Sequence, residues 1–296
     1  MSVDPLSLSH LVRIGLAPEA LLDVGQHSQP GSPQEKADEV SAEISDGLVM
    51  PDVLPATRRL FLHDTYLFES AATVVGLSFC AMEGDKVKFS VALDQTVFHY
   101  QGGGQPTDTG CILRSGIPPL VVQSVWLCKT RDVVFHDGVV DQTTVQAWQN
   151  SVGSEVWCRI DEQSRRLHAR LHSSGHLLDA AVTAVGDLGW TPGKGYHFPS
   201  GAYVEYVVGA GKKINMSIAS EKEQLINAVQ SHIDRLVALG GAVEVTERQG
   251  MRVVKMAGEA CPCGGTHVKD VGELTGLKVT KVKNSSGNIR LSYSVS

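Results

Sequence analysis

Two short segments carry the kinds of side chain that bind transition metals, and their spacing is the strongest constraint in the sequence. His172 and His176 are separated by Ser-Ser-Gly, and Cys263 and His267 by Gly-Gly-Thr. On a helix, residues four apart lie on one face about one turn from each other, so the histidine pair suits a helix. The glycines between Cys263 and His267 favour a tight loop. Zinc prefers about four ligands from cysteine sulfur and histidine nitrogen, so we expect both pairs to converge on one zinc ion.

Two neighbouring residues offer alternative ligands on spacing alone. His168 lies four residues before His172, so these two can form the helical pair in place of His172 and His176. Cys261 lies two residues before Cys263 and offers a second sulfur in the same segment. Each half of the pattern also has an ordinary structural interpretation, a polar helix face for the histidines and a buried thiol for the cysteine. The spacing therefore predicts a zinc site and leaves the choice among these ligands open.

Composition places the chain among ordinary globular proteins. Its 296 residues suit two domains better than one, and with 42% hydrophobic residues the core needs no disulfide support. The six cysteines show no regular framework and follow no signal-peptide pattern, so we expect reduced thiols in the cytoplasm. There is no apolar run of about 18 residues, so we expect no membrane span. The net charge of -6 argues against a non-specific nucleic-acid binder.

The first two segments of the chain differ in pattern. Residues 1–57 combine leucine-rich stretches with an acidic run, so we expect an extension with a flexible acidic linker. Residues 58–160 carry short runs of alternating or β-branched residues, which predict a small antiparallel β-barrel. The strands expected there are 86–93, 121–126 and 133–135, with a hairpin turn at Asp137-Gly138. The glycine-rich segment 98–110 contains three consecutive glycines, which let the backbone approach a neighbouring group closely.

Residues 161–296 show helical and strand patterns together, which predicts an α+β domain with a mainly antiparallel sheet. One helix is expected over 164–185 and contains both histidines of the first pair. A capping box at 220–223 predicts the start of a second helix, which Gly240 and Gly241 end. The expected strands are 202–208, 243–245, 277–282 and 288–293, and 190–195 is expected to be a loop.

Four segments, in the same order, resemble motifs of the editing domains of alanyl-tRNA synthetase. His172-Ser-Ser-Gly-His176-Leu-Leu is similar to the first zinc motif of that family, and Cys263-Gly-Gly-Thr-His267-Val to the second. The glycine-rich segment resembles the family's glycine motif, and Gly-Asn-Ile-Arg-Leu near the C-terminus resembles its last strand. The similarity covers about residues 58–296 and resembles most a free-standing alanyl-tRNA trans-editing protein, the AlaX type, with its N-terminal barrel.

This resemblance resolves the choice of ligands and implies a reaction. The residues before His172 resemble the approach to the first zinc histidine, which makes His168 a bystander, and Cys263 rather than Cys261 matches the cysteine ligand. The implied activity is an aminoacyl-tRNA ester hydrolase that removes serine or glycine from alanine tRNA in trans. Its implied cofactor is Zn²⁺ and its implied partner is tRNA.

Ester hydrolysis requires an attacking water and stabilisation of a developing oxyanion, which a zinc site with a free position can support. We therefore expect an open or five-coordinate zinc site in the presence of substrate. Accepting serine while rejecting alanine requires a polar partner for the hydroxyl group, and Thr266 and Gln105 are the candidates. Gly103, Gly104, Gln105 and Arg290 are expected to contact the substrate.

Three other functions compete with this one. A zinc peptidase of the HExxH type needs a glutamate after the first histidine, where this chain has Ser173. A zinc-stabilised module that binds tRNA or a protein without catalysis fits the same ligands. Editing of threonine-type tRNA is less favoured, because Gly-Gly-Thr between Cys263 and His267 matches the alanine type.

Overall fold

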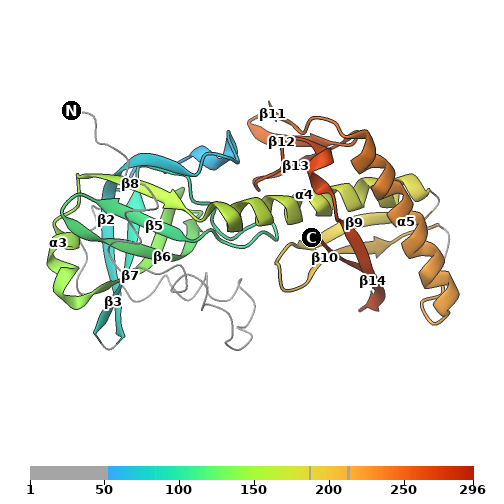
Figure 1. Cartoon of the computed structure of the whole chain (residues 1–296), viewed down its shortest axis with the longest axis horizontal. Helices are drawn as coiled ribbons and strands as arrows, with labels where there is room; N and C mark the ends of the chain where they lie inside the picture. The colour runs from blue at the N-terminus through green and yellow to red at the C-terminus, as the bar shows by residue number, and fades with distance from the viewer. Residues whose placement is uncertain (1–52, 84, 187, 212–213) are drawn as a thin grey trace. The chain divides into compact units, whose positions relative to one another are not determined.

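The computed structural model describes residues 53–83, 85–186, 188–211 and 214–296 (Figure 1). The predicted extension with its acidic linker falls almost entirely on residues outside these ranges. The helices, 3₁₀ turns included, are η2 (Leu60–Leu62), η3 (Gln142–Thr144), α3 (Val145–Gln149), α4 (Glu162–Val185), α5 (Ala219–Leu239) and η4 (Val271–Leu274). The strands are β1 (Arg58–Arg59), β2 (Glu69–Glu83), β3 (Lys86–Leu93), β4 (Gln95–Thr96), β5 (Gly110–Arg114), β6 (Ile117–Cys128), β7 (Val133–Asp141), β8 (Glu155–Ile160), β9 (Trp190–Tyr196), β10 (Ala202–Val208), β11 (Glu244–Arg248), β12 (Met251–Met256), β13 (Glu259–Pro262), β14 (Lys278–Ser285) and β15 (Asn288–Ser294).

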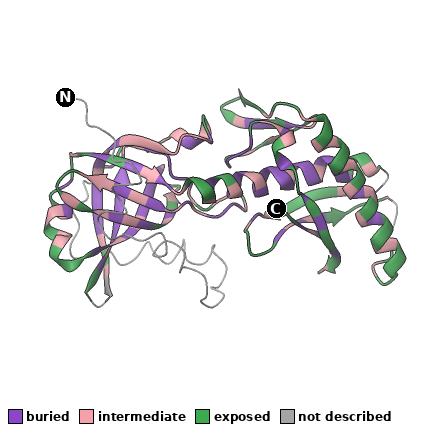
Figure 2. Cartoon of the chain, viewed as in Figure 1, coloured by how far each residue is buried: buried purple, intermediate pink, exposed green. Residues whose placement is uncertain are grey.

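Six of the strands close into a barrel in the order β2-β3-β7-β6-β5-β8. Each strand is antiparallel to both of its neighbours in the barrel. Its strands carry β-branched and aromatic residues, and much of the barrel ribbon is buried (Figure 2). The core of the barrel includes Phe89, Val91 and Leu120 from the strands and Trp148 from α3. The predicted α+β class with a small antiparallel barrel is confirmed.

The hairpin turn predicted at Asp137-Gly138 is wrong, because both residues lie inside β7. A two-residue turn of the predicted type needs positive φ at both positions, and neither residue has it. Gly138 instead lies where β7 passes close to β6: a Cβ on it would be 2.5 Å from the Val121 carbonyl oxygen. The glycine therefore serves close packing of two strands rather than a turn.

The C-terminal half contains a four-stranded antiparallel sheet in the order β14-β15-β10-β9 and a three-stranded sheet β11-β12-β13. α4 and α5 share a hydrophobic core with the larger sheet, and most of the middle of α4 is buried (Figure 2). Two further predictions in this region are wrong. The segment 190–195, predicted as a loop, belongs to strand β9 and pairs with β10. The second helix forms as α5 and ends at Gly240, but the predicted capping box is absent, because Ile218 occupies the N-cap position and makes no side-chain cap.

A buried ion pair holds the start of α4 against the barrel. Arg165 contacts the carboxylate of Asp108, which lies in the glycine-rich segment, and both side chains are almost fully buried. The guanidinium also donates to the carbonyl oxygen of Thr65 at 2.9 Å. Since a buried charge is stable only with a partner, this contact fixes the glycine-rich segment beside α4. None of the helices in the described part of the chain is long and apolar enough to cross a membrane.

Candidate metal centre

Helix α4 presents the first pair of candidate ligands. Asp161 caps the helix by accepting from Ser164 N–H at 2.8 Å, and Glu162 lies in the first turn, where a negative charge is favourable. The helix continues past His172 and His176, so their rings lie on one face with centroids 5.1 Å apart and nearly parallel planes. The helical spacing predicted from the sequence is therefore present.

The loop after β13 brings the second pair to the same place. Potential ligand atoms of His172, His176, Cys263 and His267 all lie within 4.8 Å of one another. The Sγ atom of Cys263 is 3.4 Å from Nε2 of His172 and 3.3 Å from Nε2 of His267. Sulfur and nitrogen ligands of a tetrahedral zinc lie about 3.6 Å apart, so these separations suit a single ion.

The hydrogen-bond partners of the three imidazoles also suit a metal. Nδ1 of His172 lies 2.8 Å from the amide oxygen of Gln105, which can only accept, so Nδ1 carries the proton and Nε2 keeps its lone pair. Nδ1 of His267 contacts Ser173 Oγ at 3.3 Å, and Nδ1 of His176 contacts Cys261 Sγ at 3.4 Å. Each ring thus has a partner behind it, the arrangement typical of metal-binding histidines.

One atom in the cluster lacks any partner from the protein. Nε2 of His176 is buried and makes no hydrogen bond. A buried nitrogen without a partner is costly, and a cation at the centre of the cluster would satisfy it. Together with the cysteine sulfur and the other two imidazoles, this orphaned nitrogen completes a donor set that fits zinc.

Burial keeps the three imidazoles of the cluster in a metal-binding protonation state, whereas it acts against ionisation of the cysteine. Burial lowers the pKa of His172 and His267 well below the usual value, and that of His176 to about 4, so these imidazoles are neutral at pH 7. Burial raises the pKa of the Cys263 thiol, an effect opposed by the Gly265 N–H and the cation of Arg252. Arg252 donates to the Cys263 carbonyl oxygen at 2.5 Å and to the Leu62 carbonyl oxygen at 2.9 Å.

His197 is a residue of the site that sequence reasoning missed. Its ring stacks on His172 with centroids 4.6 Å apart and planes at 19°. Tyr293 donates its hydroxyl to the Leu171 carbonyl oxygen at 2.9 Å, so Nδ1–H of His197 donates to the Tyr293 oxygen at 2.6 Å. A Cβ on Gly175 would lie 2.4 Å from the His197 ring, which explains a glycine between the two helical histidines.

A lone histidine beyond a glycine-rich stretch is a weak signal. The sequence alone does not assign His197 to the site; its position follows from the tertiary structure, in which β9 ends beside α4. Burial lowers the pKa of His197 to about 3.

The other residues predicted for the site divide into two groups. Gln105 and Thr266 are fully buried and hydrogen-bonded to each other at 2.8 Å, with Gln105 behind His172. Gly103 and Gly104 have positive φ, and the Gly104 carbonyl oxygen accepts from His197 N–H at 2.8 Å. These four positions surround the cluster.

Arg290 is not brought to the cluster. Its Nη2 donates to Glu205 at 2.5 Å, and its guanidinium lies 3.8 Å from the centre of the Tyr203 ring. These residues alternate along β10 and β15 with the buried Val204 and Leu291, so they lie on the outer face of the sheet.

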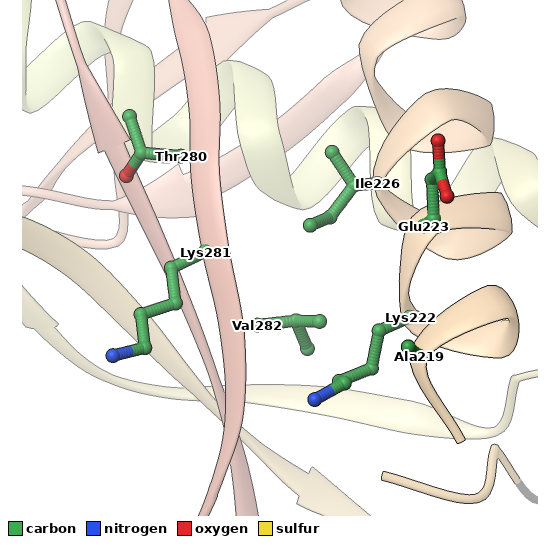
Figure 3. Close-up of a pocket in the computed structure, with 7 residues that line it drawn as sticks. All are labelled: Ala219, Lys222, Glu223, Ile226, Thr280, Lys281 and Val282. Atoms are coloured by element: carbon green, nitrogen blue, oxygen red, sulfur yellow. The ribbon is translucent and has the colours of Figure 1, made fainter. Parts of the chain in front are cut away.

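The bystander His168 is outside the cluster, as is Cys261, which contacts the rear of His176. A surface pocket of about 300 Å³ lies between α5 and β14 and is lined by side chains such as Ile226 and Val282 (Figure 3). It contains none of the four clustered residues, so the chemistry of the site does not depend on it.

Comparison with known proteins gives three kinds of match. A family model described as the threonyl and alanyl tRNA synthetase second additional domain matches residues 251–292, which include Cys263 and His267. The chain is 32% identical over 234 residues to the alanyl-tRNA editing protein AlaX-M of Pyrococcus horikoshii, covering 78% of this chain and 92% of that protein. It is 28% identical over 257 residues to AlaX-M of Methanosarcina mazei, covering 80% and 95%.

The third kind of match is to alanine–tRNA ligases. The chain is 28% identical over 291 residues to the ligase of Caldivirga maquilingensis, covering 90% of this chain and 29% of the ligase. The chain therefore spans less than a third of that enzyme.

Proposed function

Because this chain belongs to the AlaX-M family of alanyl-tRNA editing proteins, we propose that it hydrolyses the ester that joins serine or glycine to alanine tRNA, using one zinc ion. The observation that supports this most strongly is the convergence of His172, His176, Cys263 and His267 within 4.8 Å. The partner is then tRNA charged with the wrong amino acid, and the reaction belongs in the cytoplasm, where tRNA is charged.

The four clustered side chains would hold the metal, and the residues behind them would keep it in place. When bound, zinc would supply a Lewis acid for the ester or its attacking water, or a fixed point for the substrate. Gln105, Ser173 and Cys261 would hold the imidazoles in the orientation and tautomer that a metal needs.

The glycines beside His172 would keep the approach to the centre open. Gly103 and Gly104 adopt positive φ, and a Cβ on Gly104 would lie 2.4 Å from the Gly195 carbonyl oxygen. The loop can therefore lie against β9 only without a side chain. Gln105 and Thr266 satisfy each other, so we propose that they act by orienting His172 rather than by touching the amino acid.

The test measures metal content and deacylation on the same preparation of the full chain. We expect about one zinc per chain and faster release of serine or glycine than of alanine from alanine tRNA, with release abolished by a chelator and restored by zinc. Cys263→Ala should lose zinc and activity together. Cys128→Ala, which removes a thiol from the barrel strand β6, should lose neither.

Two outcomes would contradict the proposal. A chain that holds zinc but releases no amino acid from any charged tRNA would favour the non-catalytic binding module. Full activity of metal-free Cys263→Ala would show that the cluster is not the site of the reaction.

A further inference from the structure

The outer face of the four-stranded sheet carries a row of stacked aromatic rings. Tyr196 on β9 and Tyr203 on β10 are opposite each other in the strand register, with ring centroids 5.2 Å apart and planes at 18°. Phe198 extends the row beyond the end of β9, with its centroid 4.3 Å from that of Tyr196 and planes at 12°. Arg290 covers the far side of Tyr203 at 3.8 Å. All three rings are partly exposed.

Simple cross-strand packing accounts for only part of this row. Opposed tyrosines stabilise a sheet by pairing, and Tyr196 and Tyr203 do so. Phe198 lies outside the ladder and gains nothing from strand pairing, yet its ring continues the stack in nearly parallel planes. Tyr196 is stacked between Phe198 and Tyr203, so within this row the terminal ring of Phe198 is the one that can offer a face on which a nucleic-acid base stacks.

The charge of the same face suits a polyanion. Lys283 is opposite Arg290 in the register, and Lys281 is opposite Ser292, the residue that also pairs with Tyr203. Lys281 and Lys283 are exposed, as is Lys194 on β9. Among the described residues of this face, the acidic side chain close to these cations is Glu205, which is opposite Arg290 in the strand register. This basic row stands out in a chain whose net charge is -6.

The aromatic row is joined directly to the candidate metal centre. His197 lies between Tyr196 and Phe198 in sequence, and its ring stacks on His172. Successive side chains of extended backbone point to opposite sides, and consecutive Cα atoms are about 3.8 Å apart, so the row and the cluster lie on opposite sides of the same short segment. An RNA strand whose terminal ester reaches the cluster therefore has its last nucleotides within reach of these rings.

We propose that a base of the single-stranded 3′ end of tRNA stacks on Phe198 and so extends the aromatic row, with Tyr196 and Tyr203 supporting that ring from behind and Lys194, Lys281 and Lys283 contacting the phosphates. The inference rests on the proposed function, because only an RNA that carries the ester must pass the metal centre. Under this proposal Arg290 lies beside the bound RNA strand and not beside the reacting ester.

The test compares binding of two fluorescent RNA hairpins, one with a single-stranded 3′ overhang and one blunt, to the full zinc-loaded chain. We expect wild type to prefer the overhang, and Phe198→Leu to raise its Kd by about 5- to 150-fold while the blunt hairpin binds as before. Tyr196→Leu removes the ring that supports Phe198 and should raise the Kd of the overhang by a smaller factor. Tyr196→Trp keeps an aromatic ring behind Phe198 and should bind like wild type. Trp126→Leu removes another exposed ring, which stacks on the buried Phe135 of the barrel, and is the matched control.

Each other outcome overturns the proposal. Equal binding of both hairpins by wild type would exclude a single-strand surface, and wild-type affinity of Phe198→Leu for the overhang would exclude stacking. If Tyr196→Leu loses zinc through misfolding, Phe198→Leu and Tyr196→Trp decide the question. A deacylation assay separates the two proposals. If overhang binding depends on the aromatic residues but no amino acid is released, only the proposed hydrolase activity is refuted. If amino acid is released and overhang binding does not depend on the aromatic residues, only the stacking surface is refuted.

Discussion

Replacing Gly265 with alanine should destroy the metal centre, whereas the same change at Gly264 should not. A Cβ on Gly265 would lie 2.1 Å from Cε1 and 2.2 Å from Nδ1 of His172, where ordinary contacts begin near 3.4 Å. The imidazole would have to move by about 1.3 Å. It cannot do so freely, because His197 stacks on it and Gln105 holds its Nδ1.

The expected loss of affinity follows from how narrowly metal bonds are defined. Metal–ligand distances hold within about 0.2 Å, so a ring displaced by more than an ångström no longer binds. Loss of a residue behind a ligand typically weakens metal binding by about 10- to 100-fold, so displacing the ligand itself should weaken it by more than ~100-fold.

The assay is zinc affinity by competition with a chromophoric chelator, together with thermal unfolding in the presence and absence of zinc. Gly264→Ala adds the same methyl group one residue earlier, where nothing lies within 4 Å of the new Cβ. Wild-type zinc affinity in Gly265→Ala would refute the geometry of the cluster. Equal losses in both variants would show a general sensitivity of the loop instead.

Three other changes test what surrounds the site. Gln105→Met removes the acceptor behind a ligand imidazole and should weaken zinc binding about 10- to 100-fold in the chelator assay, more than Gln105→Glu does. Arg165→Met leaves the buried carboxylate of Asp108 without its cationic partner, with the His99 N–H still donating to it, and should cost about 3–5 kcal/mol in denaturant unfolding. Arg166→Met, in an exposed ion pair, should cost less than about 1 kcal/mol. Burial lowers the pKa of His136 to about 4 in the folded barrel, below the 6.5 of an unperturbed histidine, so its contribution to stability is complete above pH 6.5 and is lost as the pH falls towards 4. His136→Gln should therefore lose roughly 2 kcal/mol less stability than wild type between pH 7 and pH 4.5.

Each of these has a result that contradicts it. Equal zinc affinity in Gln105→Met and wild type would make the glutamine a packing residue only. Similar costs for Arg165→Met and Arg166→Met would mean that the buried ion pair does not hold α4 to the barrel. Parallel pH profiles for His136→Gln and wild type would show that this imidazole is not the group that titrates.

Local pattern was sufficient for several elements, because it depends on residues close together in the chain. Strands β3 and β10 follow the predicted ranges 86–93 and 202–208, since a run of alternating or β-branched and aromatic residues marks a strand wherever its partner lies. The long helix was predicted to within two residues at its start. Where local pattern was ambiguous it misled: 190–195 looks like a loop because of its glycines and proline, but pairing with β10 makes it a strand.

The residue types of the metal cluster were determined by the sequence itself, since an i, i+4 histidine pair and a Cys-Gly-Gly-Thr-His loop are each short. That they meet is a property of the tertiary structure, which brings the loop after β13 against α4. The same holds for the residues that support them. Gln105 contacts Thr266, which is 161 residues away in the chain, and His197 contacts Tyr293, which is 96 residues away. Local sequence patterns do not predict contacts between residues so far apart. Ligand identity is thus local chemistry, whereas ligand orientation, access and the aromatic surface beside the site depend on packing between distant segments.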